Sequence, residues 1–174
     1  MKKLALAALL MLTACTGKPA LDDPNLSTRA LNLEEFFQGD LVAYGQFQDV
    51  LGEVRRRFEV KINGTWDGET LRLVEDFVYE DGSTEQRIWL LEKLDEQRWQ
   101  GTADGVIGIA TGEERGDVFN WAYTIDLPVG QGETLRVTFD DWMWLLSGDR
   151  LLNRAYMKRF GVTIGEVIIY FERV

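Results

Sequence analysis

Two adjacent acids, Asp140 and Asp141, are the residues that most invite a catalytic interpretation, because Trp142 and Trp144 follow them closely. Paired carboxyl groups are typical of sugar-cleaving enzymes, in which one acid donates a proton and the other acts as a base or nucleophile. The surrounding sequence predicts a β-strand, however, and neighbouring residues of a strand point to opposite faces. Asp140 and Asp141 therefore cannot flank one bond. We predict no catalytic residue and a protein that is not an enzyme.

The composition excludes several other kinds of chemistry. The chain contains no His, which removes Ser-His-Asp and Cys-His catalysis and every metal site built on imidazole. It contains one Cys, which excludes an internal disulfide framework and a zinc ribbon. The formal net charge of −10 would repel a phosphate backbone. We therefore predict no metal, no cofactor and no nucleic-acid partner.

Charged residues interrupt the predicted apolar strand faces at three positions, Arg56, Glu75 and Asp141. A buried charge is costly unless it is paired and hydrogen-bonded. Because Arg56 and Glu75 lie on adjacent predicted strands, we predict that they form an ion pair in the interior. Further candidate members of this polar network are Arg87, Asp104, Asp140, Asn153, Arg154 and Glu166. Two interpretations stay open: a structural network that fixes strand register, or a polar anchor in a ligand cavity that holds a carboxylate or phosphate head group.

The N-terminus carries a predicted lipid-attachment signal. Lys2 and Lys3 precede the apolar run Leu4–Leu12, which has far fewer than the roughly 20 residues of a membrane-spanning helix. The single Cys, Cys15, follows this run after two small residues, an arrangement that resembles a bacterial lipoprotein signal. Its thiol would accept a diacylglyceryl group, and the acyl chains would anchor the protein to a membrane. Because Thr16 and not Asp follows Cys15, the analogy favours the periplasmic leaflet of the outer membrane.

Three segments follow from this organisation: a signal peptide over residues 1–14, a lipidated tether over 15–32, and one folded domain over 33–174. Leu31–Phe37 is a candidate short helix at the entry to the domain. Beyond it, alternating apolar and polar residues between Gly-rich turn signals predict about nine antiparallel strands. Asp149–Arg159 is compatible with either a helix or a strand. Gly105–Gly112 lacks the Lys-Ser/Thr of a phosphate-binding loop, so its glycines predict a bend, a bulge or room for a bulky neighbour.

About nine strands with one apolar face each must close into a barrel or stack as two sheets. Closure removes the exposed edges, and short connections favour it. We therefore predict an all-β fold, an up-and-down meander that closes into a lipocalin-like barrel. A two-sheet β-sandwich is the alternative.

Several short motifs together resemble an uncharacterised family of Gram-negative lipoproteins that carry a domain of unknown function. The resemblance covers the chain from about Leu33 to the C-terminus. It rests on Phe36–Gly39, Ala43–Gly45, Arg56–Phe58, Gly64–Trp66, Asp140–Met143, Asn153–Met157, Phe160–Gly161 and Gly165–Val167. It implies a single-domain envelope lipoprotein and supplies no catalytic residue.

Two functional hypotheses follow. The first is a lipid-anchored, non-enzymatic barrel that binds a small apolar or amphipathic ligand in the periplasm. The second is a structural or assembly factor of the cell envelope that acts through protein contacts and has no cavity. A hollow interior would favour the first hypothesis, and a filled interior the second.

Overall fold

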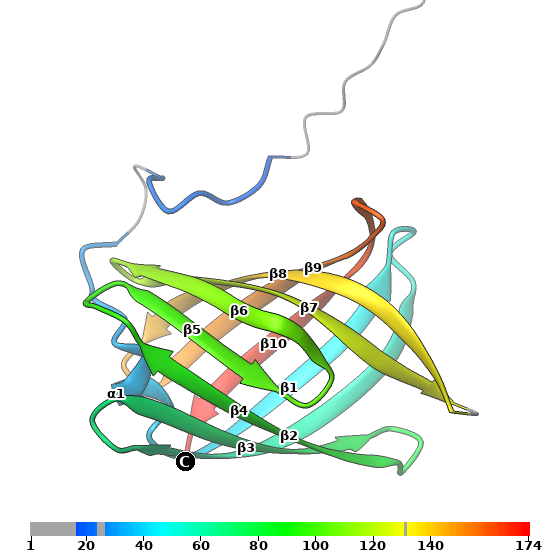
Figure 1. Cartoon of the computed structure of the whole chain (residues 1–174), viewed down its shortest axis with the longest axis horizontal. Coiled ribbons are helices and arrows are strands. Elements are labelled where there is room, and N and C mark those ends of the chain that lie inside the picture. Colours follow the sequence, from blue (N-terminus) through cyan, green and yellow to red (C-terminus); the bar gives the residue numbers. More distant parts are fainter. Residues whose placement is uncertain (1–16, 24–26, 131) are drawn as a thin grey trace, which may run out of the picture.

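The computed structural model describes residues 17–23, 27–130 and 132–174. Within these residues the chain forms one short helix and ten strands (Figure 1). Their bounds are α1 (Leu33–Phe37), β1 (Gly39–Asp49), β2 (Val54–Trp66), β3 (Thr70–Tyr79), β4 (Thr84–Lys93), β5 (Arg98–Ala103), β6 (Val106–Arg115), β7 (Val118–Gly130), β8 (Glu133–Ser147), β9 (Arg150–Arg159) and β10 (Val162–Arg173). The ambiguous segment before residue 160 is thus a strand, β9.

The strands form a closed antiparallel barrel in which each strand pairs with its neighbours in sequence and β1 pairs with β10. The predicted barrel is confirmed and the sandwich alternative is wrong. The sequence prediction of about nine strands missed one turn. Asp104 and Gly105 connect β5 to β6, and Gly105 has a φ of +82°, a conformation that a residue without a Cβ adopts readily.

Helix α1 lies at one end of the barrel (Figure 1), where Leu33, Phe36 and Phe37 are buried. The first backbone N–H groups of a helix have no acceptor within the helix, so other parts of the protein must accept their hydrogen bonds. The carboxylate of Glu114 on β6 accepts a hydrogen bond from the Leu33 N–H over 3.2 Å. Two consecutive acids, Glu113 and Glu114, are typical of a solvated turn, but Glu114 is buried on β6.

An ion pair also fastens α1 to the wall. The Lys93 ammonium lies 2.5 Å from Glu34 of the helix and 3.5 Å from Glu114. Contacts from β4 and β6 therefore hold the helix across this end.

Gly64 lets α1 approach the wall closely. An Asn-Gly pair such as Asn63-Gly64 is a strong turn signal, but β2 continues through both residues to Trp66. A Cβ at Gly64 would overlap the carbonyl oxygen of Phe37. The glycine therefore provides space for the helix and does not turn the chain.

The predicted apolar faces point into the barrel. On β8, for example, Val137 and Phe139 are buried, whereas Thr138 between them is exposed. Aromatic side chains fill much of this interior, and Trp121 packs where a Cβ on Gly112 would approach it to 2.5 Å. The prediction that a glycine of Gly105–Gly112 makes room for a bulky neighbour is confirmed at Gly112.

The segment before α1 touches the barrel wall. The Leu31 N–H donates to the Gly116 carbonyl over 2.7 Å, and the Leu31 side chain is buried with the core, although the sequence interpretation had put it in the tether. Residues 1–14 and Cys15, on which the signal-peptide and lipidation predictions rest, lie outside the described residues. No helix in the described ranges is long and apolar enough to span a membrane.

Candidate functional site

The interior of the barrel contains a cavity of about 370 Å³. This volume lies within the range of roughly 300–1,000 Å³ that is usual for small-molecule sites. The buried side chains of Leu33 and Phe37 close it at the α1 end, and its lining reaches Arg56 and Pro128 near the opposite end. Most of the lining is apolar and aromatic, including Phe58, Val60, Ile62, Phe77, Trp89, Trp121, Phe139, Met143, Met157, Ile169 and Phe171.

One wall of the cavity carries a connected set of polar groups on β3 and β4. Glu75 lies opposite Arg87 in the ladder between these strands. The Arg87 guanidinium donates to Glu85 over 2.7 Å, and the Tyr79 hydroxyl donates to the same carboxylate over 2.8 Å. Arg87 is thus held between two acids and against the ring of Phe77. The positive charge on this wall is already neutralised.

The predicted ion pair between Arg56 and Glu75 is wrong. The ladder places Glu75 beside Ile62, and Arg56 lies six residues further along β2, or about 20 Å at 3.3 Å per residue. Arg56 stacks on the Tyr79 ring, with its guanidinium carbon 3.3 Å from the ring centroid, and donates to the Ser83 hydroxyl over 3.0 Å. Its side chain is 45% exposed. It therefore belongs to the rim of the cavity.

The other wall carries polar groups without partners. Asp141 on β8 is 7% exposed, and its Oδ1 has no hydrogen-bond partner in the described part of the chain. Asn153 on β9 is 1% exposed, and neither its Oδ1 nor its Nδ2 has a partner there. Both side chains line the cavity. Buried polar atoms are nearly always hydrogen-bonded in proteins, so these atoms mark a place where a ligand can bond.

Burial changes the proton affinity of the groups around the cavity. It raises the pKa of Glu75 to about 7, an effect that the Arg87 charge opposes. Burial, reinforced by the charge of Asp140, raises the pKa of Asp141 well above the usual range. Burial and the charge of Asp141 raise the pKa of Tyr123 in the same direction. Glu75 keeps some exposed surface only because it faces the cavity. The interior therefore favours uncharged forms of its unpaired acids.

Four candidate members of the internal network lie outside the barrel: Asp140, which is described below, and Asp104, Arg154 and Glu166. Asp104 is exposed in the turn between β5 and β6. Arg154 and Glu166 form an ion pair of 2.6 Å, but they do so on the outer faces of β9 and β10. The predicted inward placement of these three residues is wrong. Strand alternation explains two of them, since Asn153 and Val167, the neighbours of this pair, are the residues that face inward.

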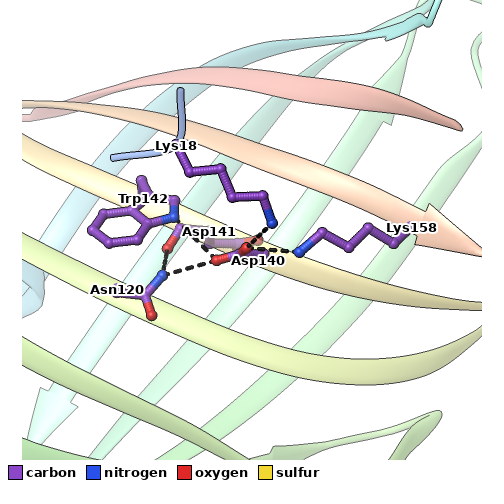
Figure 2. Close-up of polar contacts among 6 residues, drawn as sticks. All are labelled: Lys18, Asn120, Asp140, Asp141, Trp142 and Lys158. Carbon is purple, nitrogen blue, oxygen red and sulfur yellow. Dashed lines mark hydrogen bonds and ion pairs between the residues drawn. The ribbon is translucent and has the colours of Figure 1, made fainter. Parts of the chain in front are cut away.

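Asp140 points outward, as strand alternation predicts, while Asp141 lines the cavity. Figure 2 shows the polar contacts that surround the Asp140 carboxylate. The Asp140 carboxylate accepts hydrogen bonds from Lys158 over 2.8 Å, from the Trp142 indole over 3.0 Å and from Asn120 over 3.1 Å. The Lys18 ammonium reaches the same carboxylate at 3.4 Å. This cluster ties the N-terminal segment to the outer wall and has no access to the cavity side of the strand.

Sequence reasoning missed the functional position of three polar side chains, Tyr79, Glu85 and Tyr123. Each lies at an inward position of its strand and lines the cavity. Tyr79 and Tyr123 have the alternation of apolar inward positions, so only their hydroxyl groups distinguish them from core residues. Glu85 lies two residues before Arg87 on β4, so strand alternation is the signal that indicates its inward position. No group of three or more His, Cys, Asp or Glu side chains in the described ranges could hold a metal ion.

A closed antiparallel barrel with an internal, largely apolar cavity defines the chain as a lipocalin-like barrel protein. It belongs to the family described as "Protein of unknown function (DUF3833)", which matches residues 9–173. The predicted membership of a family with a domain of unknown function is therefore confirmed. No curated protein matches the chain.

Two solved structures are similar to this chain. The S-type phycobiliprotein lyase CPES from Guillardia theta is 11% identical, with a TM-score of 0.58 over 83% of this chain and 93% of that chain. The structure of EF1p2_mFAP2b bound to DFHBI is 8% identical, with a TM-score of 0.45 over 82% of this chain and 100% of that chain. At this identity the likeness to the lyase supports the barrel fold and no particular activity.

Proposed function

We propose that this protein is a non-enzymatic binding module that holds a small apolar or amphipathic molecule inside its barrel. The observation that carries the proposal is the cavity of about 370 Å³ with its aromatic and aliphatic walls. Transfer of an apolar molecule from water into such a space is favourable because apolar surface is removed from water. The few polar groups on the walls would orient the molecule, as is usual in small-molecule sites.

The shape of the barrel supports entry from one end. Leu33 and Phe37 of α1 fill the opposite end with buried side chains. The rim residue Arg56 is half-exposed and stacks on Tyr79, so a cation–π pair borders the entrance. A ligand would therefore enter past Arg56 and extend toward Asn153.

The alternative, an assembly factor that acts only through protein contacts, calls for a filled interior. The cavity counts against it, because interiors that serve stability alone are packed with few voids larger than a water molecule. The phycobiliprotein lyase is a protein of this fold whose name indicates action on a phycobiliprotein. That precedent adds no activity to this chain, and our proposal remains binding without catalysis.

Binding can be tested with N-phenyl-1-naphthylamine, an uncharged dye whose fluorescence rises in apolar surroundings. We expect saturable one-to-one binding to the wild-type protein. Ala155→Phe places a ring in the cavity and should weaken binding at least about tenfold, which equals about 1.4 kcal/mol. Thr102→Phe on the exposed face of β5 is the control and should bind like wild type. Absence of saturable binding by a folded wild-type protein would contradict the proposal.

We further propose that the protein is anchored through acyl chains on Cys15 to the periplasmic leaflet of the outer membrane. The support is the signal pattern of residues 1–16. Serine cannot form the thioether that lipidation requires, so Cys15→Ser should leave an uncleaved precursor or a mislocalised chain. Fractionation of the Ser variant with the outer membrane at its mature mass would contradict the lipidation proposal and leave the binding proposal standing.

A further inference from the structure

Asn153 and Asp141 are adjacent on the inner wall. In the ladder between β8 and β9, Asn153 lies opposite Met143, and Asp141 lies opposite Ala155. The two side chains are therefore diagonal neighbours on one face, with a separation of about 7–8 Å between Cα atoms. Together they carry three buried polar atoms that have no hydrogen-bond partner in the described ranges, Asp141 Oδ1, Asn153 Oδ1 and Asn153 Nδ2. One small head group can reach both residues.

A negatively charged head group would find no free cation in the cavity. Only two arginines, and no lysine, belong to the part of its lining that the structure describes. Arg87 is engaged by Glu85 at 2.7 Å, and Arg56 is held at the rim by Ser83 and Tyr79. Three carboxyl groups line the same space, those of Glu75, Glu85 and Asp141. Burying an anion beside them would be costly, because it would have no partner of opposite charge.

We propose that the cavity selects a ligand with an apolar chain or ring system and an uncharged hydrogen-bonding head group, such as a primary amide or an alcohol, which binds Asn153 and Asp141. This inference rests on the proposed binding function and specifies its ligand class. The Asn153 amide supplies donors and an acceptor to such a head group. Burial raises the pKa of Asp141 and so favours its protonated carboxyl group, which can both donate and accept a hydrogen bond.

Competition among three matched ten-carbon compounds tests the head-group preference. Decanamide, decanoate and decylamine share the chain and differ in charge, and each would displace N-phenyl-1-naphthylamine from the unmodified protein at pH 7. We expect decanamide to compete at a concentration at least about tenfold lower than either charged compound. The decanoate carboxylate would find no free cation, and the decylamine ammonium would find an anion only if Asp141 or Glu75 lost its proton, which burial opposes. Equal or stronger competition by decanoate or decylamine would overturn the inference.

A variant of the head-group site provides an independent readout. Asn153→Leu replaces the amide by an apolar group of similar size, so dye binding should persist. The preference for decanamide over decanoate and decylamine should fall at least about fivefold. Asn63→Leu, on the exposed face of β2, is the matched control and should keep the wild-type preference. A preference for decanamide that survives in Asn153→Leu would show that Asn153 does not bind the head group.

The two proposals fail in different ways. If the dye does not bind the folded wild-type protein, the binding function itself is wrong. If the dye binds and is displaced without preference among the three compounds, the cavity binds ligands but the inferred head-group specificity is wrong.

Discussion

The polar side chains of the interior are paired near the mouth and unpaired further inside. Arg56 stacks on Tyr79 at the rim, and Arg87 forms an ion pair with Glu85. Asp141 and Asn153 sit on the opposite wall without partners in the described ranges. A natural core avoids such groups because each one costs free energy. Their retention beside a cavity is what distinguishes this interior from a purely structural core.

Glu75 provides a pH-dependent test of the interior. Its pKa is about 7 in the folded protein, against an ordinary value of 4.5. Between these values the folded protein binds more protons than the unfolded chain, so the free energy of unfolding falls as pH rises through this window. Glu75→Gln removes the titration, and relative to wild type it should gain up to about 3 kcal/mol between pH 4 and pH 8.

Urea unfolding at a series of pH values measures this effect. Glu59→Gln, on the exposed face of β2, is the matched control and should reproduce the wild-type profile. Wild-type and Glu75→Gln profiles of the same slope between pH 4 and pH 8 would show that Glu75 is not buried as described.

Individual side chains were predictable from the sequence where strand alternation alone decides their direction. Asp141 facing inward and Asp140 facing outward followed from that rule. Partners were not predictable, because they depend on register. Glu75 meets Arg87 and not Arg56 since the short turn between β3 and β4 sets that pairing. Arg56 has the alternation of an inward residue, but it lies near a strand end, where the barrel opens to solvent.

Among the elements, α1 and the strand β2 determine where the cavity ends. The helix is too short to be stable alone, so its position depends on contacts with the barrel. Those contacts include the Glu114 acceptor at the Leu33 N–H and the Lys93–Glu34 ion pair. The close approach of Phe37 to Gly64 completes the closure.

Gly64→Ala tests this closure. The added Cβ would overlap the Phe37 carbonyl oxygen, and backbone cannot move aside as a flexible side chain can. We expect a loss of about 1–3 kcal/mol in the free energy of unfolding. Gly148→Ala is the matched control, since a Cβ there meets no atom within 4 Å, and it should change stability by no more than about 0.5 kcal/mol. Equal stability of the two variants would contradict the described packing of α1.

The number and bounds of elements were only partly predictable from turn residues. Asn63 and Gly64 have a strong turn signal, yet β2 runs through them because the glycine is needed for helix contact. Asp104-Gly105 has the same kind of signal within a stretch of several glycines, and there the chain does turn. A glycine in a β-protein can allow a turn with positive φ, or it can allow another part of the chain to approach a strand closely. The sequence alone does not distinguish these two roles.

At the scale of the whole molecule, the meander topology was predictable because alternating faces and short connections leave few ways to remove the sheet edges. Whether the closed barrel is hollow was not predictable, since the same aromatic residues can fill an interior or line a cavity. Closure by ten strands with α1 at one end leaves about 370 Å³ between those side chains. The proposed binding function therefore requires a ligand that occupies this space.

Quenching of intrinsic tryptophan fluorescence by a ten-carbon alcohol brominated at mid-chain measures this occupancy most directly. Trp89 and Trp121 line the cavity, so a bromine inside the barrel would lie beside their rings. We predict saturable quenching of the wild-type protein with one-to-one stoichiometry, and at least about tenfold weaker binding to Ala155→Phe. Quenching that rises linearly without saturation, or that is the same in wild type and in folded Ala155→Phe, would contradict binding inside the barrel.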